Sequence, residues 1–462
     1  MVPESGRQIG VRWPPESADD ADVLARRVAL IGVHLGSIAA VFGLSKLHAV
    51  RYEYDFTSST RFAWALGYAA LLSLVAYAAG LPDAARTSRA LASVGATVVA
   101  AIGVSVAQLV VGTPVLPRFV VFGSAAGLAG WYWLLARIVG RFDDASERRD
   151  RVVFVGSDAD AALFADDIDL APERPARLLE RTHPAEVRPR RPGDEPLVDL
   201  VIASKATVLV LGREAQDDTA VVAQASALHE AGVRVRTLCA FYEEWLGKLP
   251  ISDLERLSLM FDIREVHQVR YGRVKRLLDL AVAVPACVAF VAAIPFVAIG
   301  NRFGNRGPLL YAQIRVGAHG ERFSILKFRT MRPDGGRMAN EWTTEDDPRI
   351  TRFGGILRRT HLDELPQVWN VLRGDLSFVG PRPEQPHYVD ELSQKLPFYG
   401  LRHLVRPGLT GWAQVKYGYA GNERDALEKL QYEFFYLGHQ SLRFDLRVMG
   451  RTLRSVFHSD GR

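Results

Sequence analysis

Long uncharged runs dominate the first third of the chain. Residues 28–45, 62–80, 90–112 and 119–136 contain no Asp, Glu, Lys or Arg. A helix needs roughly 17–25 largely apolar residues to cross a bilayer, so each run is long enough for one crossing. The pattern predicts a four-helix transmembrane bundle within residues 1–141. A cleaved signal peptide is the alternative for the first run, but no small-residue cleavage pattern follows it and three more runs do.

Basic residues after the fourth run set the expected orientation. They are Arg137, Arg141, Arg148, Arg149 and Arg151. Positive residues close to membrane helices favour the cytoplasmic side. Lys46, Arg51 and Arg61, between the first two runs, favour the opposite orientation less strongly. We therefore expect a multi-pass membrane protein, with everything after the bundle facing the cytoplasm.

Short apolar runs alternate with helical patterns in residues 150–265. Residues 151–156 and 206–212 are typical of buried strands, residues 219–231 are typical of a helix, and residues 233–238 are a third strand candidate. This alternation predicts a Rossmann-like parallel sheet covered by helices. The turn after the first strand has Gly156 but lacks the later glycines that let a backbone approach a pyrophosphate. A structural or regulatory sheet is favoured over a dinucleotide site, and residues 170–196 are expected to form a flexible loop.

A fifth uncharged run, residues 280–300, contains Pro285 and Pro295. Proline inside a helix removes a hydrogen bond and clashes with the preceding turn, so a bend is expected. One interpretation is a kinked fifth span. The other, which we favour, is a re-entrant helix over about residues 277–300 that returns to the cytoplasmic side. Re-entry keeps the carboxylates that follow on the side where cytosolic nucleotides are available.

Charge is unevenly distributed. From Arg270 onward 29 Lys and Arg stand against 19 Asp and Glu, a net charge of +10, and the preceding residues carry −5. A basic C-terminal domain, residues 270–462, suits phosphorylated substrates, anionic lipid or nucleic acid. We do not expect nucleic acid, because the paired aromatic and basic signature of such folds is missing. Two distant cysteines, Cys239 and Cys287, support neither a disulfide framework nor a cysteine metal site.

Two adjacent carboxylates, Asp363 and Glu364, lie in a strongly basic segment. Neighbouring residues on a helix point about 100° apart, so the two side chains suit different tasks. Pro366 fits a first helical turn and Gly374 a helix end, which places Asp363 near a helix N-terminus. We expect the helix dipole and the nearby arginines to keep Asp363 ionised, the form that can attack phosphorus. The alternative is a capping pair, since Asp and Glu are common in first turns.

Four basic residues are candidates for phosphate binding. Arg358 precedes the dyad and Arg382 lies between two prolines, and arginine's planar fork matches phosphate oxygens. Lys327 and Arg329 alternate with Phe328 on a predicted strand, so both are expected to face one side. These four residues could bind a nucleotide diphosphate or could be ordinary solvated charges.

Five ordered motifs carry a resemblance. They span residues 307–317, 323–331, 358–376, 380–384 and 406–415, after a segment that includes Lys275, Arg276 and Asp279. From about residue 275 to 457 the chain resembles the bacterial sugar transferase family, the monotopic phosphoglycosyl transferases. Together with the spans and the sheet, the layout resembles the long members that prime exopolysaccharide, capsule or O-antigen synthesis, such as undecaprenyl-phosphate galactose or glucose phosphotransferases.

The resemblance implies a reaction. A hexose-1-phosphate would move from a UDP-hexose donor to undecaprenyl phosphate, releasing UMP. Asp363 would be the nucleophile that carries the phosphosugar, and Glu364 would bind Mg²⁺ or handle a proton. Gln414 would line the substrate cleft, while Lys275, Arg276 and Asp279 would begin the re-entrant helix. Similar hairpins often break at Ser-Pro, but this chain has Ile294-Pro295, so Pro285 is a second candidate for the bend. We also expect contact with membrane lipid and a homodimer.

Two other classes of function are alternatives to a transferase. A membrane-bound nucleotide-sugar dehydratase is suggested by the Tyr-x-x-x-Lys spacing of Tyr271 and Lys275, but the glycines Gly300, Gly304 and Gly307 follow that pair and do not precede it. A non-catalytic scaffold or sensor would keep the architecture and lose the carboxylates, and the dyad is present.

Overall fold

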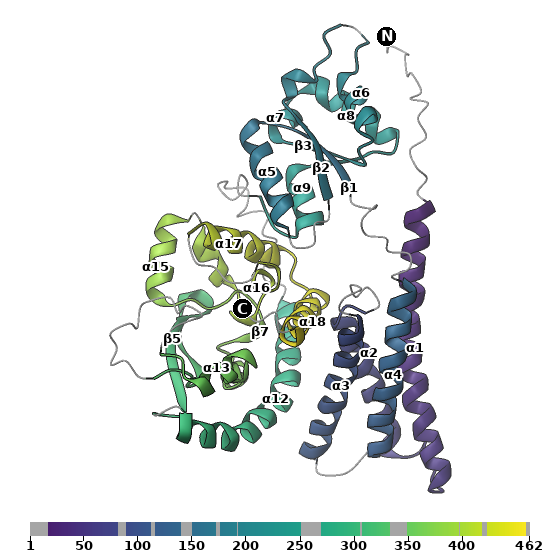
Figure 1. Ribbon diagram of the computed structural model, residues 1–462, viewed down its shortest axis with the longest axis vertical. Helices are drawn as coiled ribbons and strands as arrows, with labels where there is room; N and C mark the ends of the chain where they lie inside the picture. Colours follow the sequence, from purple (N-terminus) through teal and green to yellow (C-terminus); the bar gives the residue numbers. More distant parts are fainter. Residues whose placement is uncertain are drawn as a thin grey trace. The chain divides into compact units, whose positions relative to one another are not determined.

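The computed structural model describes most of the chain. The described residues are 17–81, 89–111, 116–139, 150–171, 176–191, 193–250, 269–304, 307–332, 349–396, 398–417 and 423–458. They form two compact units (Figure 1). Unit 1 contains the described residues of 1–21 and 144–262, and unit 2 contains those of 22–143 and 263–462.

Within the described residues, five helices are long and apolar enough to cross a membrane. Four of them are α1 (Ser17–Arg51), α2 (Thr60–Ala78), α3 (Arg89–Val111) and α4 (Arg118–Val139), and the fifth is α12 (Val269–Gly304). Small and apolar residues fill the interior of the first four, including Ala65, Ala69 and Leu72. Long apolar side chains such as Leu35 and Ile102 point outward. This distribution suits a lipid-facing surface, and the predicted apolar membrane helices are confirmed.

Unit 1 is a four-stranded parallel sheet covered by helices. The strands are β1 (Asp150–Val155), β2 (Ala176–Thr182), β3 (Val208–Leu211) and β4 (Arg234–Thr237), in the order β2-β1-β3-β4. The helices are α5 (Asp158–Leu170), η1 (Pro184–Glu186), α6 (Pro196–Ser204), α7 (Arg213–Gln216), α8 (Thr219–Glu230), α9 (Leu238–Phe241) and η2 (Tyr242–Leu246). Every residue of β3 is buried, as expected for a central parallel strand. The three predicted strands and the predicted helix are confirmed.

The expectation of a flexible loop over residues 170–196 is wrong. This segment contains β2 and η1, and β2 pairs in parallel with β1. Arg177, Glu180 and Arg181 interrupt any apolar pattern in β2. The strand lies at the sheet edge, where it has one neighbour and much of its surface is solvated, so burial imposes no hydrophobic pattern on it.

The C-terminal part of unit 2 contains two short sheets with helices packed around them. Strands β5 (Leu310–Val316) and β6 (Arg322–Phe328) pair antiparallel, and β7 (Ser377–Val379) pairs in parallel with β8 (Gly408–Thr410). The helices around them are η3 (Ala318–Gly320), α13 (Arg352–Arg359), η4 (Leu362–Glu364), α14 (Gln367–Arg373), α15 (Pro386–Lys395), η5 (Tyr399–Leu404), α16 (Trp412–Lys416), α17 (Glu423–Gly438) and α18 (Leu442–His458).

Helix α12 continues through Pro285 and Pro295 and curves along its length (Figure 1). Its first half packs through Ala283 against β6 and α14, and its second half packs through Val297 against Phe328 and Leu357. Both halves therefore rest on the same globular body. A Cβ at Gly300 would overlap the Phe353 ring, so the second half approaches α13 closely.

Candidate active site

The dyad lies in a single 3₁₀ turn, η4, between two helices. His361, which precedes η4, has φ 53°, and this left-handed conformation turns the chain sharply after α13. Pro366 caps the start of α14, and Gly374 ends it at φ 97°. The predicted roles of Pro366 and Gly374 are confirmed. The helix begins after the dyad, so Asp363 and Glu364 lie just before it.

Asp363 is the buried member of the dyad, with 8% of its surface exposed. Burial raises the pKa of its carboxyl, and Glu364 adds to this, while Lys327, Arg358 and His361 oppose it by their positive charge. That the helix dipole and nearby arginines keep Asp363 ionised stays a prediction, because burial acts against the anion. The surrounding cations are what favour the anion.

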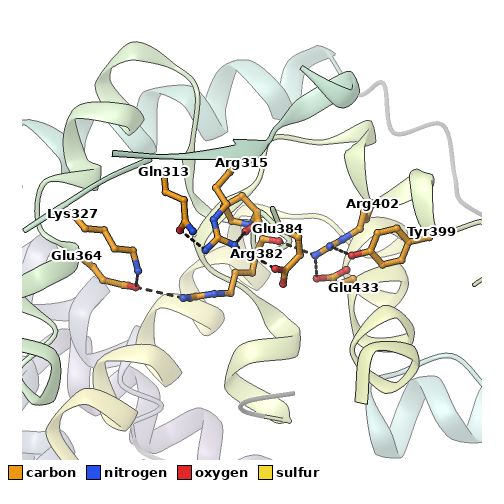
Figure 2. Close-up of polar contacts among 10 residues, drawn as sticks. Gln313, Arg315, Lys327, Glu364, Arg382, Glu384, Tyr399, Arg402 and Glu433 are labelled. Atoms are coloured by element: carbon orange, nitrogen blue, oxygen red, sulfur yellow. Dashed lines mark hydrogen bonds and ion pairs between the residues drawn. The ribbon is translucent and has the colours of Figure 1, made fainter. Parts of the chain in front are cut away.

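Glu364 is held by two cations. Lys327 Nζ donates to Glu364 Oε1 at 2.7 Å, and Arg382 Nη2 lies 3.5 Å from the same oxygen (Figure 2). Burial would raise the pKa of Glu364, but the charges of Lys327 and Arg382 and the hydrogen bond from Lys327 outweigh it and lower the pKa to about 2. Glu364 is therefore an anion at neutral pH. Two adjacent carboxylates in one turn thus have opposite pKa shifts, which suits different tasks.

Arg358 is oriented by a residue that sequence reasoning did not single out. Its Nε donates to the buried Thr330 hydroxyl at 3.1 Å. Helix α13 can reach Thr330 because Gly354 has no side chain: a Cβ there would overlap the Thr330 carbonyl. Arg358 is one of the cations acting on Asp363. Thr330 lies in the motif of residues 323–331, which the sequence shows, but its hydrogen bond with Arg358 depends on tertiary packing.

The other sequence candidates divide into two groups. Lys327 and Arg382 meet at Glu364, and Arg382 also lines a small cavity with Gln414, Glu433 and Tyr436. The buried Gln414 Oε1 has no hydrogen-bond partner. Strand β6 ends at Phe328, one residue before Arg329, whose guanidinium donates to the Pro308 carbonyl at 2.9 Å and lies over the Tyr311 ring. The pairing nevertheless continues past the strand end, because the Arg329 N–H donates to the Leu309 carbonyl at 3.0 Å. Tyr311, under the Arg329 guanidinium, pairs directly with Lys327, so Lys327 and Arg329 face one side as predicted.

Residues in the first turns of α12 form hydrogen bonds with the elements that follow the dyad. Arg276 donates to the Val371 and Leu372 carbonyls at the end of α14, at 2.6 and 2.8 Å. Asp279 accepts from the Ser377 hydroxyl and the Phe378 N–H, both at 3.0 Å. Arg276 thus connects α12 to α14, the helix that follows the dyad, and Asp279 connects α12 to β7.

Tyr271 and Lys275 serve a structural network. The Tyr271 hydroxyl and Lys275 Nζ both donate to Asp445 Oδ2, at 2.6 and 2.7 Å, and the Tyr436 hydroxyl donates to Oδ1 at 2.8 Å. Asp445 is completely buried. The pair joins α12 to α18, and it therefore gives no support to a dehydratase site.

A divalent cation would find few ligands here. Among the described residues no group of three His, Cys, Asp or Glu side chains could hold a metal ion. The dyad offers two carboxylates. Mg²⁺ is commonly bound by one or two carboxylates plus substrate phosphates, so the residues fit a metal that is completed by a bound diphosphate.

Comparison with known proteins identifies the class. The sequence profile of the family described as bacterial sugar transferase matches residues 270–459. The chain is 38% identical over 191 residues to a UDP-N-acetylgalactosamine-undecaprenyl-phosphate N-acetylgalactosaminephosphotransferase of Aeromonas hydrophila, covering 41% of this chain and 45% of the relative. It is 39% identical over 214 residues to a UDP-glucose:undecaprenyl-phosphate glucose-1-phosphate transferase of Xanthomonas campestris pv. campestris, covering 45% and 43%.

A shorter relative is matched over most of its length. It is a UDP-glucose:undecaprenyl-phosphate glucose-1-phosphate transferase of Caulobacter vibrioides, 40% identical over 190 residues, which are 40% of this chain and 70% of the relative. The chain belongs to the bacterial sugar transferase family, and the predicted membership is confirmed. The match spans less than half the length of the Aeromonas and Xanthomonas relatives.

Proposed function

We propose that this protein is a priming transferase that moves hexose-1-phosphate from a UDP-hexose to undecaprenyl phosphate. The products would be undecaprenyl-diphosphate-hexose and UMP, for exopolysaccharide, capsule or O-antigen synthesis. Matched relatives are named for transfers of this kind. The observation that carries the proposal is the dyad itself, in which a buried carboxylate lies beside a second carboxylate held by Lys327 and Arg382.

The chemistry follows from these two environments. An Asp363 oxygen would attack the phosphorus that carries the sugar, the bond from that phosphorus to the bridging oxygen would break, and UMP would leave. A phosphate oxygen of undecaprenyl phosphate would then attack the same phosphorus and free Asp363. Arg358 and Arg382 would bind phosphate oxygens, and Gln414 would line the substrate cleft. Lys327 holds Glu364 in its anionic form.

Mg²⁺ would be held by Glu364 together with phosphate oxygens of the donor, and when bound it would neutralise charge on the diphosphate. Arg329 remains a candidate for donor binding. It lies over Tyr311, the residue of β5 that pairs with Lys327, and so on the same face of the strand pair as Lys327.

Membrane topology is part of the proposal. Helices α1 to α4 would form a transmembrane bundle, and α12 would be re-entrant, bent at Pro285, Pro295 or both. Support comes from α12 itself, whose two halves pack on one globular body through Ala283 and Val297. A straight crossing would carry Val297 to the far surface and away from that body. The site would then face the cytoplasm at the inner membrane.

Unit 1 would be a degenerate Rossmann-like domain with a structural or regulatory role. Its first turn supports this view, since Ser157 after Gly156 caps α5 by accepting the Asp160 N–H at 3.2 Å. We also propose a homodimer in the membrane, a state that sedimentation of the detergent-purified chain would test.

The decisive experiment uses the purified chain in detergent or nanodiscs. UMP release is measured with undecaprenyl phosphate, a panel of UDP-hexoses, and Mg²⁺ or EDTA. We expect release with at least one donor, loss with EDTA, and a fall of at least about 10³-fold in Asp363→Asn, because the nucleophile is removed.

Trapping separates the covalent route from direct transfer. Without undecaprenyl phosphate, the wild-type chain should gain the mass of a hexose phosphate on the peptide containing Asp363, and Asp363→Asn should not. Full UMP release by Asp363→Asn would contradict the mechanism, and no release by the wild type with any donor would contradict the function.

A further inference from the structure

The loop that carries Arg382 has an unusual set of anchors. It lies between β7 and α15, outside helix and strand, and Pro381 and Pro383 deprive it of two N–H donors. Four consecutive carbonyls nevertheless each accept a hydrogen bond from elsewhere. Pro381 accepts from the Gly408 N–H at 2.8 Å, and Glu384 accepts from the Val316 N–H at 2.9 Å. The two carbonyls between them, of Arg382 and Pro383, accept from arginine side chains.

Arg402, on η5, holds the first of these carbonyls. Its Nη2 donates to the Arg382 carbonyl at 2.8 Å and to Glu433 Oε1 at 2.7 Å, while Nη1 donates to the Tyr399 hydroxyl (Figure 2). The side chains of Arg402 and Glu433 are only 5% and 6% exposed. Because a guanidinium is planar and presents donors at fixed angles, Glu433 and Tyr399 fix the direction in which Arg402 meets the loop.

Arg315, on β5, holds the second carbonyl from another element. Its Nη1 donates to the Pro383 carbonyl at 3.1 Å and lies 3.4 Å from Glu384 Oε2, and its Nη2 donates to Gln313 at 2.8 Å (Figure 2). Two arginines from distant parts of the sequence therefore meet adjacent peptide units of one loop. That loop then presents the Arg382 guanidinium 3.5 Å from Glu364.

A purely structural ion pair would not need this arrangement. In unit 1, Lys248 and Asp167 form a buried pair at 2.8 Å, with side chains 4% and 10% exposed, and Asp167 also accepts from the Tyr242 hydroxyl. That network joins side chains to one another. Arg402 and Arg315 instead donate to the main-chain carbonyls of two successive residues, Arg382 and Pro383, which fixes the backbone from which the Arg382 side chain starts.

We infer that Arg402 and Arg315 are positioning residues, which hold the loop backbone so that Arg382 reaches Glu364 and the donor diphosphate. The catalytic consequence rests on the proposed function. Arg382 would have to find this position among many conformers if the loop were free, and a phosphate-binding arginine that is misplaced by about 1 Å loses much of its effect.

A double variant tests the inference without leaving a buried charge unpaired. In Arg402→Met with Glu433→Leu, apolar side chains replace both ions. We expect kcat/KM for UMP release to fall about 10²-fold, as in Arg382→Ala, because both changes remove the same donor from the phosphate. Adding Arg382→Ala to the double variant should cause no further fall. A multiplicative fall would overturn the inference. Lys248→Met with Asp167→Asn, a buried pair in unit 1, is the control and should keep wild-type kcat/KM.

Hydrogen exchange gives a readout that does not depend on activity. In the full-length chain, the amides of Gly408 and Val316, which donate to the Pro381 and Glu384 carbonyls, should exchange faster in the double variant than in the wild type, while peptides of α14 keep their protection. Unchanged exchange of these two amides would overturn the inference whatever the kinetics show. If the wild type releases no UMP with any donor, the proposed function fails and this measurement alone decides whether Arg402 holds the loop.

Discussion

At the scale of single residues, the dyad shows how environment separates two similar groups. Asp363 and Glu364 are neighbours, yet burial raises the pKa of Asp363 while Lys327 and Arg382 lower that of Glu364 to about 2. The fact that two carboxyl groups are neighbours in the sequence therefore says little about which of them is protonated. The partners come from β6 and from the loop before α15, far away along the chain.

The pH dependence of the reaction should report Asp363. Attack requires the anion, so kcat/KM should fall as pH drops through the raised pKa of Asp363. Removing a nearby positive charge disfavours the anion and raises this pKa further. In Arg358→Gln we therefore expect the acidic limb to move to higher pH, with kcat/KM at the optimum lower by on the order of 10²-fold.

The neighbouring arginine supplies the control. Arg359 is exposed on α13, and its Nε donates to the Gly355 carbonyl. Arg359→Gln should leave the acidic limb of the pH profile in place. If Arg358→Gln and Arg359→Gln give the same limb as the wild type, Arg358 does not act on Asp363 as described.

At the scale of elements, Gly354 determines how closely α13 can pack against Thr330. A Cβ at Gly354 would overlap the Thr330 carbonyl, whereas a Cβ at Gly355 would meet nothing within 4 Å. The two glycines are adjacent in one helix, so alanine has the same intrinsic helix preference at both. Any difference between the two alanine variants must come from packing.

We expect Gly354→Ala to destabilise the protein and displace Arg358, with a loss of roughly 1–3 kcal/mol in unfolding free energy from overpacking and a clear fall in kcat/KM. Gly355→Ala should gain about 0.5–1 kcal/mol, because glycine is unfavourable inside a helix, and should keep its activity. Thermal unfolding and UMP release check both. Equal melting temperatures for the two variants would contradict the close approach of α13 to Thr330.

At the scale of the whole molecule, the path of α12 decides which chemistry is accessible. A re-entrant helix keeps the residues before and after α12 on one side, and a full crossing separates them. The substitutions Cys239→Ser and Cys287→Ala remove both native cysteines. A single cysteine introduced into this background then shows on which side of the membrane its position lies. Suitable exposed positions are Glu230 in unit 1, Arg322 on β6 and Ser58 between α1 and α2.

We expect Glu230→Cys and Arg322→Cys to react with a membrane-impermeant maleimide only in inside-out vesicles, and Ser58→Cys only in right-side-out vesicles. The reason is that, in the proposed topology, α12 returns to the side from which it starts, while α1 crosses. Labelling of Arg322→Cys from the outside would show that α12 spans the membrane and would remove the site from cytosolic UDP-sugars.

The sequence alone determined the parts whose signal is local. Uncharged runs of spanning length, the strands β1, β3 and β4, the helix boundaries at Pro366 and Gly374, and the order of the family motifs all depend on neighbouring residues. Burial or bilayer insertion imposes most of these patterns directly on the chain. The edge strand β2 escaped this reasoning because Arg177, Glu180 and Arg181 leave it no apolar run.

Only the tertiary structure decided how the site is built. It brought Lys327 and Arg382 to one oxygen of Glu364, Arg358 to Thr330, and the Arg329 side chain to Pro308. It also revealed that Arg402 and Arg315 hold the Arg382 loop, which no local pattern indicates. Contacts between residues distant in sequence depend on the packing of whole elements, and electrostatic environment depends on that packing in turn. The chemistry of the dyad is therefore a property of the folded chain.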